Sequence, residues 1–245
     1  MTAFRIVQLQ PSALAVTGDR GNALVLRSRL ELAGLAVELL EIDGASPLPA
    51  SADLVVIGNG PFSAVEAVMP WLQESGPRLR EWIEDDVPLL AVGAGFEALG
   101  AEIRHTDGSI LAALGLLPVR VDHRGDRRVG YVGVVAEPGE LIAFEDWRGT
   151  TMVDDGAVPF GEVTRGVTGT RGSGDGVRYR NAVGTRLQGP VLPLNPAFAD
   201  WLIGLATARR GVSYEPGDAH AELDRRAAEA RAVIRKHIDH PFTHI

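Results

Sequence analysis

The chain contains no cysteine among its 245 residues. This absence excludes disulfide bonds, thiolate metal sites, iron–sulfur clusters and cysteine nucleophiles. Lysine is almost as scarce: Lys236 is the only one, and the other 23 of the 24 basic residues are arginine. A catalytic lysine, or the lysine of a phosphate-binding loop, therefore has almost no place in this chain.

Long apolar runs and an excess of positive charge are also missing. No segment approaches the roughly 18 consecutive apolar residues of a membrane span, and residues 1–7 lack the basic-then-apolar pattern of a signal peptide. The net charge of -8 argues against nucleic acid or an anionic membrane as a partner, because phosphate recognition needs clustered positive charge. We therefore expect a cytoplasmic protein with no membrane insertion and no nucleic-acid partner.

The first 100 residues alternate between strand and helix patterns. Strands are expected at residues 4–9, 35–42, 54–57 and 89–92, and helices at 19–33, 63–83 and 96–99, with Asp19 as a cap for the first helix and a break in the second near Gly76-Pro77. The continuous apolar run at 54–57 is typical of a parallel strand covered on both faces. The pattern predicts an α/β fold, with a mostly parallel, doubly wound sheet flanked by helices.

The second half follows a different pattern, with strands at short spacing. These strands are expected at residues 117–121, 129–135, 141–144 and 177–183, and they predict antiparallel additions to the edge or flank of the sheet. Residues 161–176, rich in glycine, threonine and arginine, are expected to form an exposed loop. Two helices follow, at 197–209 and 219–238. We expect one domain over residues 1–210, and a C-terminal helix and tail over residues 211–245.

Two glycine-rich turns follow buried strands and are candidate site elements. The first, Gly58-Asn59-Gly60-Pro61, is either an amide nest for a ligand or an ordinary strand-to-helix turn. The second, residues 89–96, has the strand, small-residue turn and helix of a nucleophile elbow. Its elbow position is Gly93, which offers no side chain. The backbone pattern of a nucleophile site is therefore present without its nucleophile.

Histidine and arginine give weaker signals. Neither His105 nor His123 follows a buried strand, so no Ser-His-Asp or Cys-His arrangement is recognisable. The three residues His237, His240 and His244 have spacings like those of a metal cluster, but Pro241 interrupts the helix that would align them. We predict a solvated tail there and no metal or cofactor. Arg127, at the start of a strand, is either a carboxylate-binding guanidinium or an ordinary surface arginine. The charged face formed by Arg225, Arg226, Glu229 and Arg231 is expected to be solvated rather than a docking surface.

Several motifs between residues 4 and 210 occur in an order that one family shares. They are Asp19-x-Gly21-Asn22, Ile57-Gly58-x-Gly60, the elbow ending in Leu99-Gly100, Arg127-x-x-Gly130, Phe144-Glu145-Asp146-x-Arg148-Gly149 and Gly184-Thr185-x-Leu187-x-Gly189-Pro190-x-Leu192-x-x-Asn195. The set resembles the cobyric-acid-synthase-type (CobB/CobQ-like) class I glutamine amidotransferases, and within them the GatD-like glutaminase subunits of lipid II isoglutaminyl synthase. The resemblance implies a flavodoxin-like sheet.

The resemblance also implies a mechanism. In the family, an elbow cysteine attacks the carboxamide of glutamine, a histidine before Gly-Pro acts as the base, and ammonia passes to a Mur-ligase-like partner, MurT, in peptidoglycan synthesis. Carried over to this sequence, the resemblance implies that the substrate is bound by the backbone amides of Gly58, Asn59, Gly60 and Ala94. The guanidinium that holds the α-carboxylate of glutamine is that of Arg127.

The sequence departs from the family where the chemistry lies. The nucleophile position is Gly93 and the base position is Gln188, while Pro61, Phe62 and Trp147 replace polar family residues. We therefore predict a pseudoenzyme: a non-catalytic subunit that serves a MurT-like ligase and whose pocket, widened by glycine at the elbow, still binds a small amino acid. The alternative is a different, carboxylate-based chemistry in the same pocket. Its candidate carboxylates are Glu97, Asp126, Glu145 and Asp146.

Overall fold

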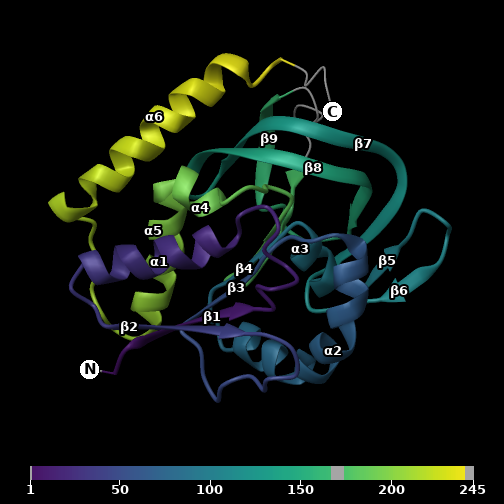
Figure 1. The fold of residues 1–245 in the computed structure, drawn as a ribbon, viewed down its shortest axis with the longest axis horizontal. Helices are drawn as coiled ribbons and strands as arrows, with labels where there is room; N and C mark the ends of the chain where they lie inside the picture. The colour runs from purple at the N-terminus through teal and green to yellow at the C-terminus, as the bar shows by residue number, and fades with distance from the viewer. Residues whose placement is uncertain (1, 167–173, 241–245) are drawn as a thin grey trace.

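The computed structural model describes residues 2–166 and 174–240 and is built around a six-stranded sheet (Figure 1). The strand order is β11-β12-β4-β3-β1-β2. The strands are β1 (Phe4–Leu9), β2 (Val37–Ile42), β3 (Leu54–Ile57), β4 (Leu89–Val92), β11 (Val177–Tyr179) and β12 (Ala182–Thr185). All neighbours in this sheet pair in parallel except β11 with β12. The order 2-1-3-4-12 confirms the flavodoxin-like α/β class.

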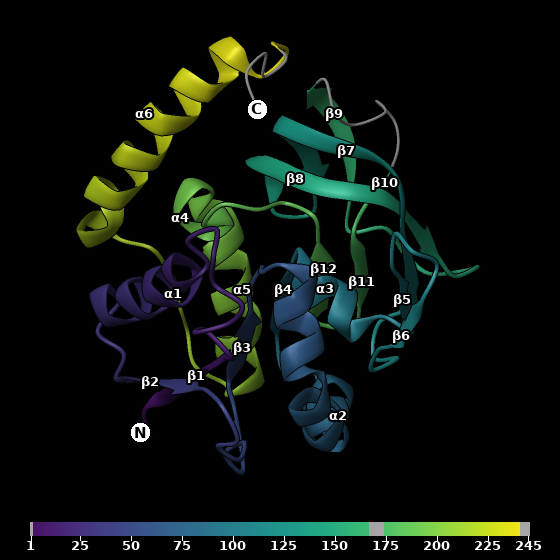
Figure 2. The same ribbon diagram turned by 45° about the vertical axis from the view of Figure 1, so that its right-hand side comes forward.

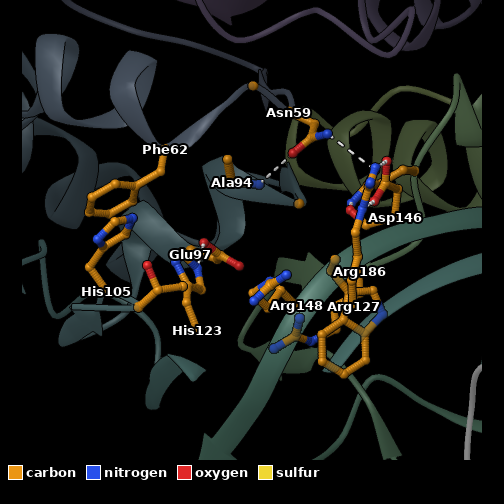
Figure 3. Close-up of a pocket in the computed structure, with 15 residues that line it drawn as sticks. Asn59, Phe62, Ala94, Glu97, His105, His123, Arg127, Asp146, Arg148 and Arg186 are labelled. Atoms are coloured by element: carbon orange, nitrogen blue, oxygen red, sulfur yellow. Dashed lines mark hydrogen bonds and ion pairs between the residues drawn. The ribbon is translucent and has the colours of Figure 1, made fainter. Parts of the chain in front are cut away.

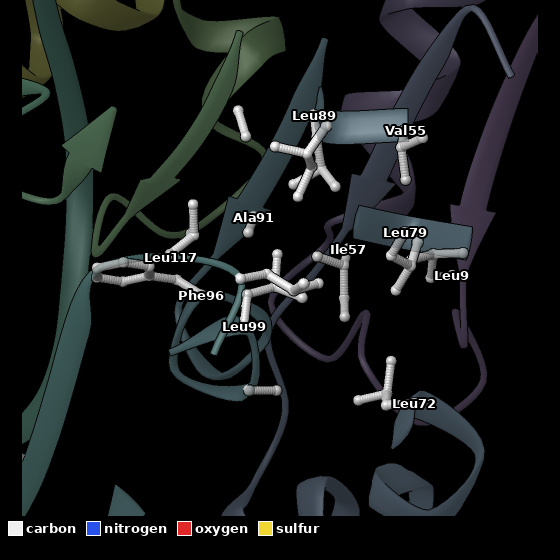
Figure 4. Close-up of a cluster of buried hydrophobic side chains, with 14 of the residues drawn as sticks. Leu9, Val55, Ile57, Leu72, Leu79, Leu89, Ala91, Phe96, Leu99 and Leu117 are labelled. Carbon is white, nitrogen blue, oxygen red and sulfur yellow. The ribbon is translucent and has the colours of Figure 1, made fainter. Parts of the chain in front are cut away.

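Helices cover both faces of this sheet (Figures 1 and 2). They are α1 (Arg20–Leu32), α2 (Phe62–Glu84), α3 (Ala94–Leu99), α4 (Val191–Leu194) and α5 (Pro196–Arg209). Because side chains alternate along a strand, Val55 and Ile57 pack with α2 and α3, while Leu54 and Val56 pack with α1 and α5. Figure 4 shows the first of these clusters. The parallel strands are thus buried on both faces, as their continuous apolar runs predict.

A second sheet arches over one end of the first (Figure 2). Its order is β10-β9-β7-β5-β6, and β8 pairs with β7. Its strands are β5 (Glu102–Arg104), β6 (Ile110–Ala112), β7 (Val119–Ala136), β8 (Gly139–Val153), β9 (Gly161–Gly166) and β10 (Gly174–Asp175). The long β7–β8 hairpin is antiparallel, with a register shift between Asp122 and Arg127. The second half therefore builds a sheet of its own and adds only the β11–β12 pair to the first.

The C-terminal segment lies along α1, α4 and α5 (Figure 1). A short 3-10 helix, η1 (Asp218–His220), precedes α6 (Ala221–His237). The fully buried Arg29 of α1 connects these elements, because it forms ion pairs with Asp200 of α5 and Asp224 of α6 at 2.6 Å each. The His220 ring lies 2.9 Å from the Arg29 carbonyl oxygen. The segment after residue 210 is therefore attached to the domain by buried polar contacts.

Four sequence predictions are wrong in detail. Helix α2 continues through Gly76-Pro77, because Leu72 and Leu79 on either side of the expected break are fully buried in one cluster. The expected loop at 161–176 contains β9 and β10, which pair with each other, and β9 also pairs with β7; its residues 167–173 lie outside the described residues. The expected strand at 177–183 is a hairpin that turns at Arg180, whose φ is 53°.

The fourth correction concerns Arg231 of α6. Only 15% of its side chain is exposed, and it donates to Asn195 Oδ1 at 2.7 Å and to the Glu140 carbonyl oxygen. Arg225 and Arg226 are exposed and pair with Glu222 of the same helix. In the described residues no helix is long and apolar enough to cross a membrane.

Candidate active site

The carboxyl ends of β3, β4 and β12 lead into a cavity of about 280 Å³. The segments that follow these strands supply Asn59, Gly93 and Gln188 to its wall, and β7 and β8 supply Arg127 and Asp146. In doubly wound sheets, ligands bind at the carboxyl ends of the strands. The cavity lies where the fold predicts a site.

Gly93 forms the elbow between β4 and α3. Its φ of 55° and ψ of -117° give the sharp turn of a strand-to-helix elbow, a conformation that glycine adopts without strain. Its N–H donates to the Thr185 carbonyl oxygen at 2.9 Å, and its own carbonyl oxygen accepts from the Glu97 N–H at 3.1 Å. The turn that would present a nucleophile is therefore intact and held at both ends.

Asn59 occupies the space in front of this elbow (Figure 3). A Cβ atom at Gly93 would lie 2.3 Å from Asn59 Oδ1 and 2.7 Å from its Cγ. The same Oδ1 accepts a hydrogen bond from the backbone N–H of Ala94 at 2.9 Å. The prediction that glycine widens the pocket here is wrong, because the carboxamide of Asn59 fills the vacated position.

Gln188 continues the hydrogen bonds of Asn59 on the side away from Ala94. Its Oε1 accepts from Asn59 Nδ2 at 3.1 Å, and its Nε2 donates to the Asp146 carbonyl oxygen at 2.8 Å. The side chain is almost fully buried. A continuous series of hydrogen bonds thus runs from the Ala94 amide through two side-chain carboxamides to β8. A carboxamide does not take up a proton near neutral pH, so Gln188 is no general base.

The glycines of the 58–60 turn allow the close approach that places Asn59. A Cβ at Gly58 would lie 2.3 Å from the Leu14 carbonyl oxygen and 2.5 Å from Asp19 Cβ, and one at Gly60 would lie 2.6 Å from the Ala13 carbonyl oxygen. Asp19 does not cap α1 with its side chain; its Oδ2 accepts from the Thr17 hydroxyl at 2.8 Å. Burial raises the pKa of Asp19 above its usual value.

Arg127 lines the cavity but already has a partner. Its Nε and Nη2 donate to the two carboxylate oxygens of Asp146 at 2.7 Å each, a bidentate pair that also raises the pKa of Arg127. The neighbouring Arg128 lines a different cavity, with Trp147 and Glu145. The resemblance implies that Arg127 holds the α-carboxylate of glutamine, and in the structure its guanidinium is paired with Asp146.

Four aromatic and acidic residues face Arg127 across the cavity (Figure 3). His123 Nε2 lies 2.8 Å from Glu97 Oε2. The ring of His105 stacks on Phe62 with centroids 4.4 Å apart. The sequence gives no sign that His105, which follows β5, lies near His123 on β7. The two meet because β5 pairs with β7.

Arg186 is a cavity residue that the sequence analysis does not single out. It is 6% exposed, and its guanidinium lies 3.6 Å from the centroid of the Trp147 ring. Its Nη1 and Nη2 are buried and have no hydrogen-bond partner. Burial lowers the pKa of Arg186, and the charges of Glu97, Asp175 and Glu145 act in the opposite direction.

The four candidate carboxylates do not lie in one cavity. Glu97 and Asp146 line the cavity, each with a cationic or imidazole partner. Glu145 is buried and lines the cavity that contains Arg128. Asp126 is exposed and lines neither. Among residues 2–166 and 174–240, no group of three or more histidine, aspartate or glutamate side chains is arranged to hold a metal ion.

Asp175, behind Arg186, predicts a pH dependence of stability. Burial raises its pKa from 3.8 to about 6, although Thr185 Oγ1 donates to it at 2.5 Å. Between about pH 4 and pH 6 the folded chain retains a proton that the unfolded chain has released, so the free energy of unfolding should fall as the pH rises through this window. Asp175→Asn should flatten this decrease in urea titrations, whereas exposed Asp85→Asn should not. An unchanged profile for Asp175→Asn would contradict the assignment.

Comparison with known proteins identifies the family. The CobB/CobQ-like glutamine amidotransferase domain matches residues 5–195, which include the 58–60 turn, the elbow and Gln188. The chain belongs to this family. The membership confirms the resemblance seen in the motifs.

Two relatives of this amidotransferase domain match over most of their length. One is the GatD subunit of lipid II isoglutaminyl synthase (glutamine-hydrolyzing) from Staphylococcus aureus, 28% identical over 94% of this chain and 95% of the relative. The GatD subunit from Streptococcus pneumoniae is 24% identical over 84% and 82%. A solved glutamine amidotransferase from Thermotoga maritima, 16% identical, shares the fold with a TM-score of 0.52 over 96% of this chain and 95% of that chain.

Proposed function

We propose that the chain is a GatD-like subunit that does not hydrolyse glutamine and serves as the non-catalytic partner of a Mur-ligase-like enzyme, MurT or a protein like it, in the amidation of lipid II. One observation carries the proposal. The carboxamide of Asn59 occupies the nucleophile position at Gly93 and hydrogen-bonds to Gln188 at the base position.

Each step of covalent glutamine hydrolysis lacks its group in this cavity. Gly93 has no side chain to attack a carboxamide, and Gln188 has no basic nitrogen to accept a proton. The Ala94 N–H, which follows the elbow and would stabilise an oxyanion, already donates to Asn59. Nucleophile, base and this oxyanion donor are therefore missing or occupied together.

The relatives support a subunit role. Both are named as the GatD subunit of a glutamine-hydrolysing lipid II isoglutaminyl synthase, and the match extends over nearly the full length of the Staphylococcus aureus protein. The scaffold around the elbow is retained here, with Gly93 and Gly58 in close-packed turns. A retained scaffold without its reactive groups fits a chain that is selected for assembly with a ligase rather than for turnover.

The first expected result concerns turnover. The purified chain incubated with L-glutamine should release ammonia at the rate of the buffer blank, with or without a Mur-ligase-like partner, since removal of nucleophile and base typically costs several orders of magnitude. A coupled ammonia assay measures this, with Staphylococcus aureus GatD as the active control. Turnover that depends on the chain and saturates with glutamine would refute the proposal.

The partnership is tested by co-expression with a Mur-ligase-like protein. We expect a stable complex on size exclusion, in which the ligase amidates lipid II when ammonium is supplied but not when glutamine is. A ligase that neither binds the chain nor changes its activity in its presence would remove this part of the proposal while leaving the loss of hydrolysis untouched.

A second candidate is an enzyme that uses acid–base chemistry in the same cavity. The observation that favours it is the His123–Glu97 pair, whose 2.8 Å contact resembles that of a base and its orienting carboxylate. It ranks second because Asp146, the other carboxylate at the cavity, is held by Arg127.

A further inference from the structure

The cavity at the elbow carries more positive than negative charge, although the chain as a whole has a net charge of -8. Arg127, Arg148 and Arg186 line it together with two carboxylates, Glu97 and Asp146. Asp146 neutralises Arg127, and Glu97 is bonded to His123. Two guanidinium groups, those of Arg148 and Arg186, remain without a hydrogen-bonded counter-charge among the described residues.

Arg186 is the stronger of these two features. It is 94% buried, and both terminal nitrogens lack an acceptor. A buried guanidinium stays charged, and each donor that is removed from water without an acceptor costs free energy. The carboxylates of Glu97, Glu145 and Asp175 act on it through space, but none of them accepts a hydrogen bond from Nη1 or Nη2. An anionic ligand is the acceptor that would satisfy these nitrogens.

Arg148 offers a second anion contact at the opening of the cavity. Arg148 is exposed, and among residues 2–166 and 174–240 its side chain makes no hydrogen bond or ion pair. Figure 3 shows Arg148 and Arg186 on the same side of the cavity, opposite Phe62 and His105. Two guanidinium groups on one wall suit a ligand with two anionic groups, since each can hold a carboxylate by paired N–H donors.

The elbow offers its backbone donor to neither an amide nor a carboxylate, so the guanidinium groups decide between them. Because the Ala94 N–H already donates to Asn59 Oδ1, an amide ligand would not find this backbone donor free. The cations of Arg148 and Arg186 remain available to a carboxylate. The volume of about 280 Å³ lies just below the roughly 300–1,000 Å³ of pockets for drug-sized ligands, so the ligand is the size of a small metabolite.

We propose that this cavity binds a small organic dicarboxylate, with one carboxylate on Arg186 and the other on Arg148, in preference to the corresponding amide. This inference rests on the proposed function, because a cavity that hydrolysed glutamine would need the amide.

Isothermal titration of the full chain with five probes tests the proposal: glutarate, L-glutamate, butyrate, L-glutamine and inorganic phosphate. Glutarate should bind at least about tenfold more tightly than butyrate, and L-glutamate at least about tenfold more tightly than L-glutamine, because each comparison removes one charge-assisted contact. Ammonia is measured in the L-glutamine sample. Its release would refute the proposed function, whereas its absence together with no preference for the dicarboxylates would refute only this inference.

Variants assign the contacts. Arg148→Gln should weaken glutarate at least about tenfold and leave butyrate almost unchanged, whereas Arg186→Gln should weaken both. Arg78→Gln, which replaces an exposed arginine on α2 that pairs with Glu81, is the matched control and should change neither. Since Arg186→Gln alters a buried site and can unfold the chain, the exposed Arg148→Gln keeps the test decisive. Equal glutarate affinity in Arg148→Gln, or phosphate binding as tight as glutarate, would overturn the proposal.

Discussion

The double substitution Gly93→Cys with Gln188→His is expected to leave glutamine hydrolysis at background. A cysteine Cβ at position 93 would lie 2.3 Å from Asn59 Oδ1, so the thiol is accommodated only if the Asn59 side chain moves. Such a movement would break its hydrogen bond to Ala94. With Asn59 in place, the new nucleophile and the new base are separated by a carboxamide.

Removal of that carboxamide should change the result. The triple variant with Asn59→Gly added should hydrolyse glutamine at least about a hundredfold faster than the double variant, a small part of the roughly 10⁶-fold that a nucleophile and its base supply in a hydrolase. The measurement is ammonia release under single-turnover and steady-state conditions.

Two controls separate the effect of Asn59 from a general change in the turn. Asn59→Gly alone should remain at background because it has no nucleophile, and Asn181→Gly in the double variant should give no gain, because Asn181 contacts Asp86 far from the elbow. Full activity in the double variant would show that Asn59 does not block the site. A triple variant that folds and binds ligand but stays inactive would show that the rest of the cavity is also unsuited to hydrolysis.

The substitution Arg29→Met is expected to have the largest effect on stability. Arg29 has no exposed side-chain area, and it holds Asp200 at 2.6 and 2.7 Å and Asp224 at 2.6 Å. Removing one partner of a buried ion pair typically costs about 3–5 kcal/mol, because the other charge is left unpaired. Since Asp224 is partly exposed, we expect about 3 kcal/mol, measured as the free energy of unfolding in urea.

The loss should be concentrated at the C-terminal segment. Amide exchange in α6 should accelerate more than in β1 or β3, because the Arg29 side chain connects α1 to α5 and α6. Arg20→Met, on the same helix and paired with Glu41 at the surface, is the control and should change stability by less than about 1 kcal/mol. A similar loss of unfolding free energy in both variants would show that the buried ion pairs of Arg29 stabilise the fold no more than a surface ion pair does.

The sequence by itself determined the first four strands of the central sheet, because each of them is a local pattern. Runs such as Leu54–Ile57 and Leu89–Val92 are apolar throughout, and only parallel strands that are covered on both faces tolerate such runs at this spacing. The elbow was also recognisable, since it needs only a strand, small residues and a helix in order. The motif order then indicated the family, and the prediction that the nucleophile is missing at Gly93 followed from a single letter.

Tertiary structure decided what fills the site and where the second half folds. Asn59 meets Gln188 across 129 positions of sequence, and Glu97 meets His123 across 26. Arg29 meets Asp224 across 195. No local periodicity encodes such contacts, because they depend on which strands become neighbours. The continuity of α2 through Pro77 has the same cause: burial of its apolar face outweighs the local preference of proline to end a helix.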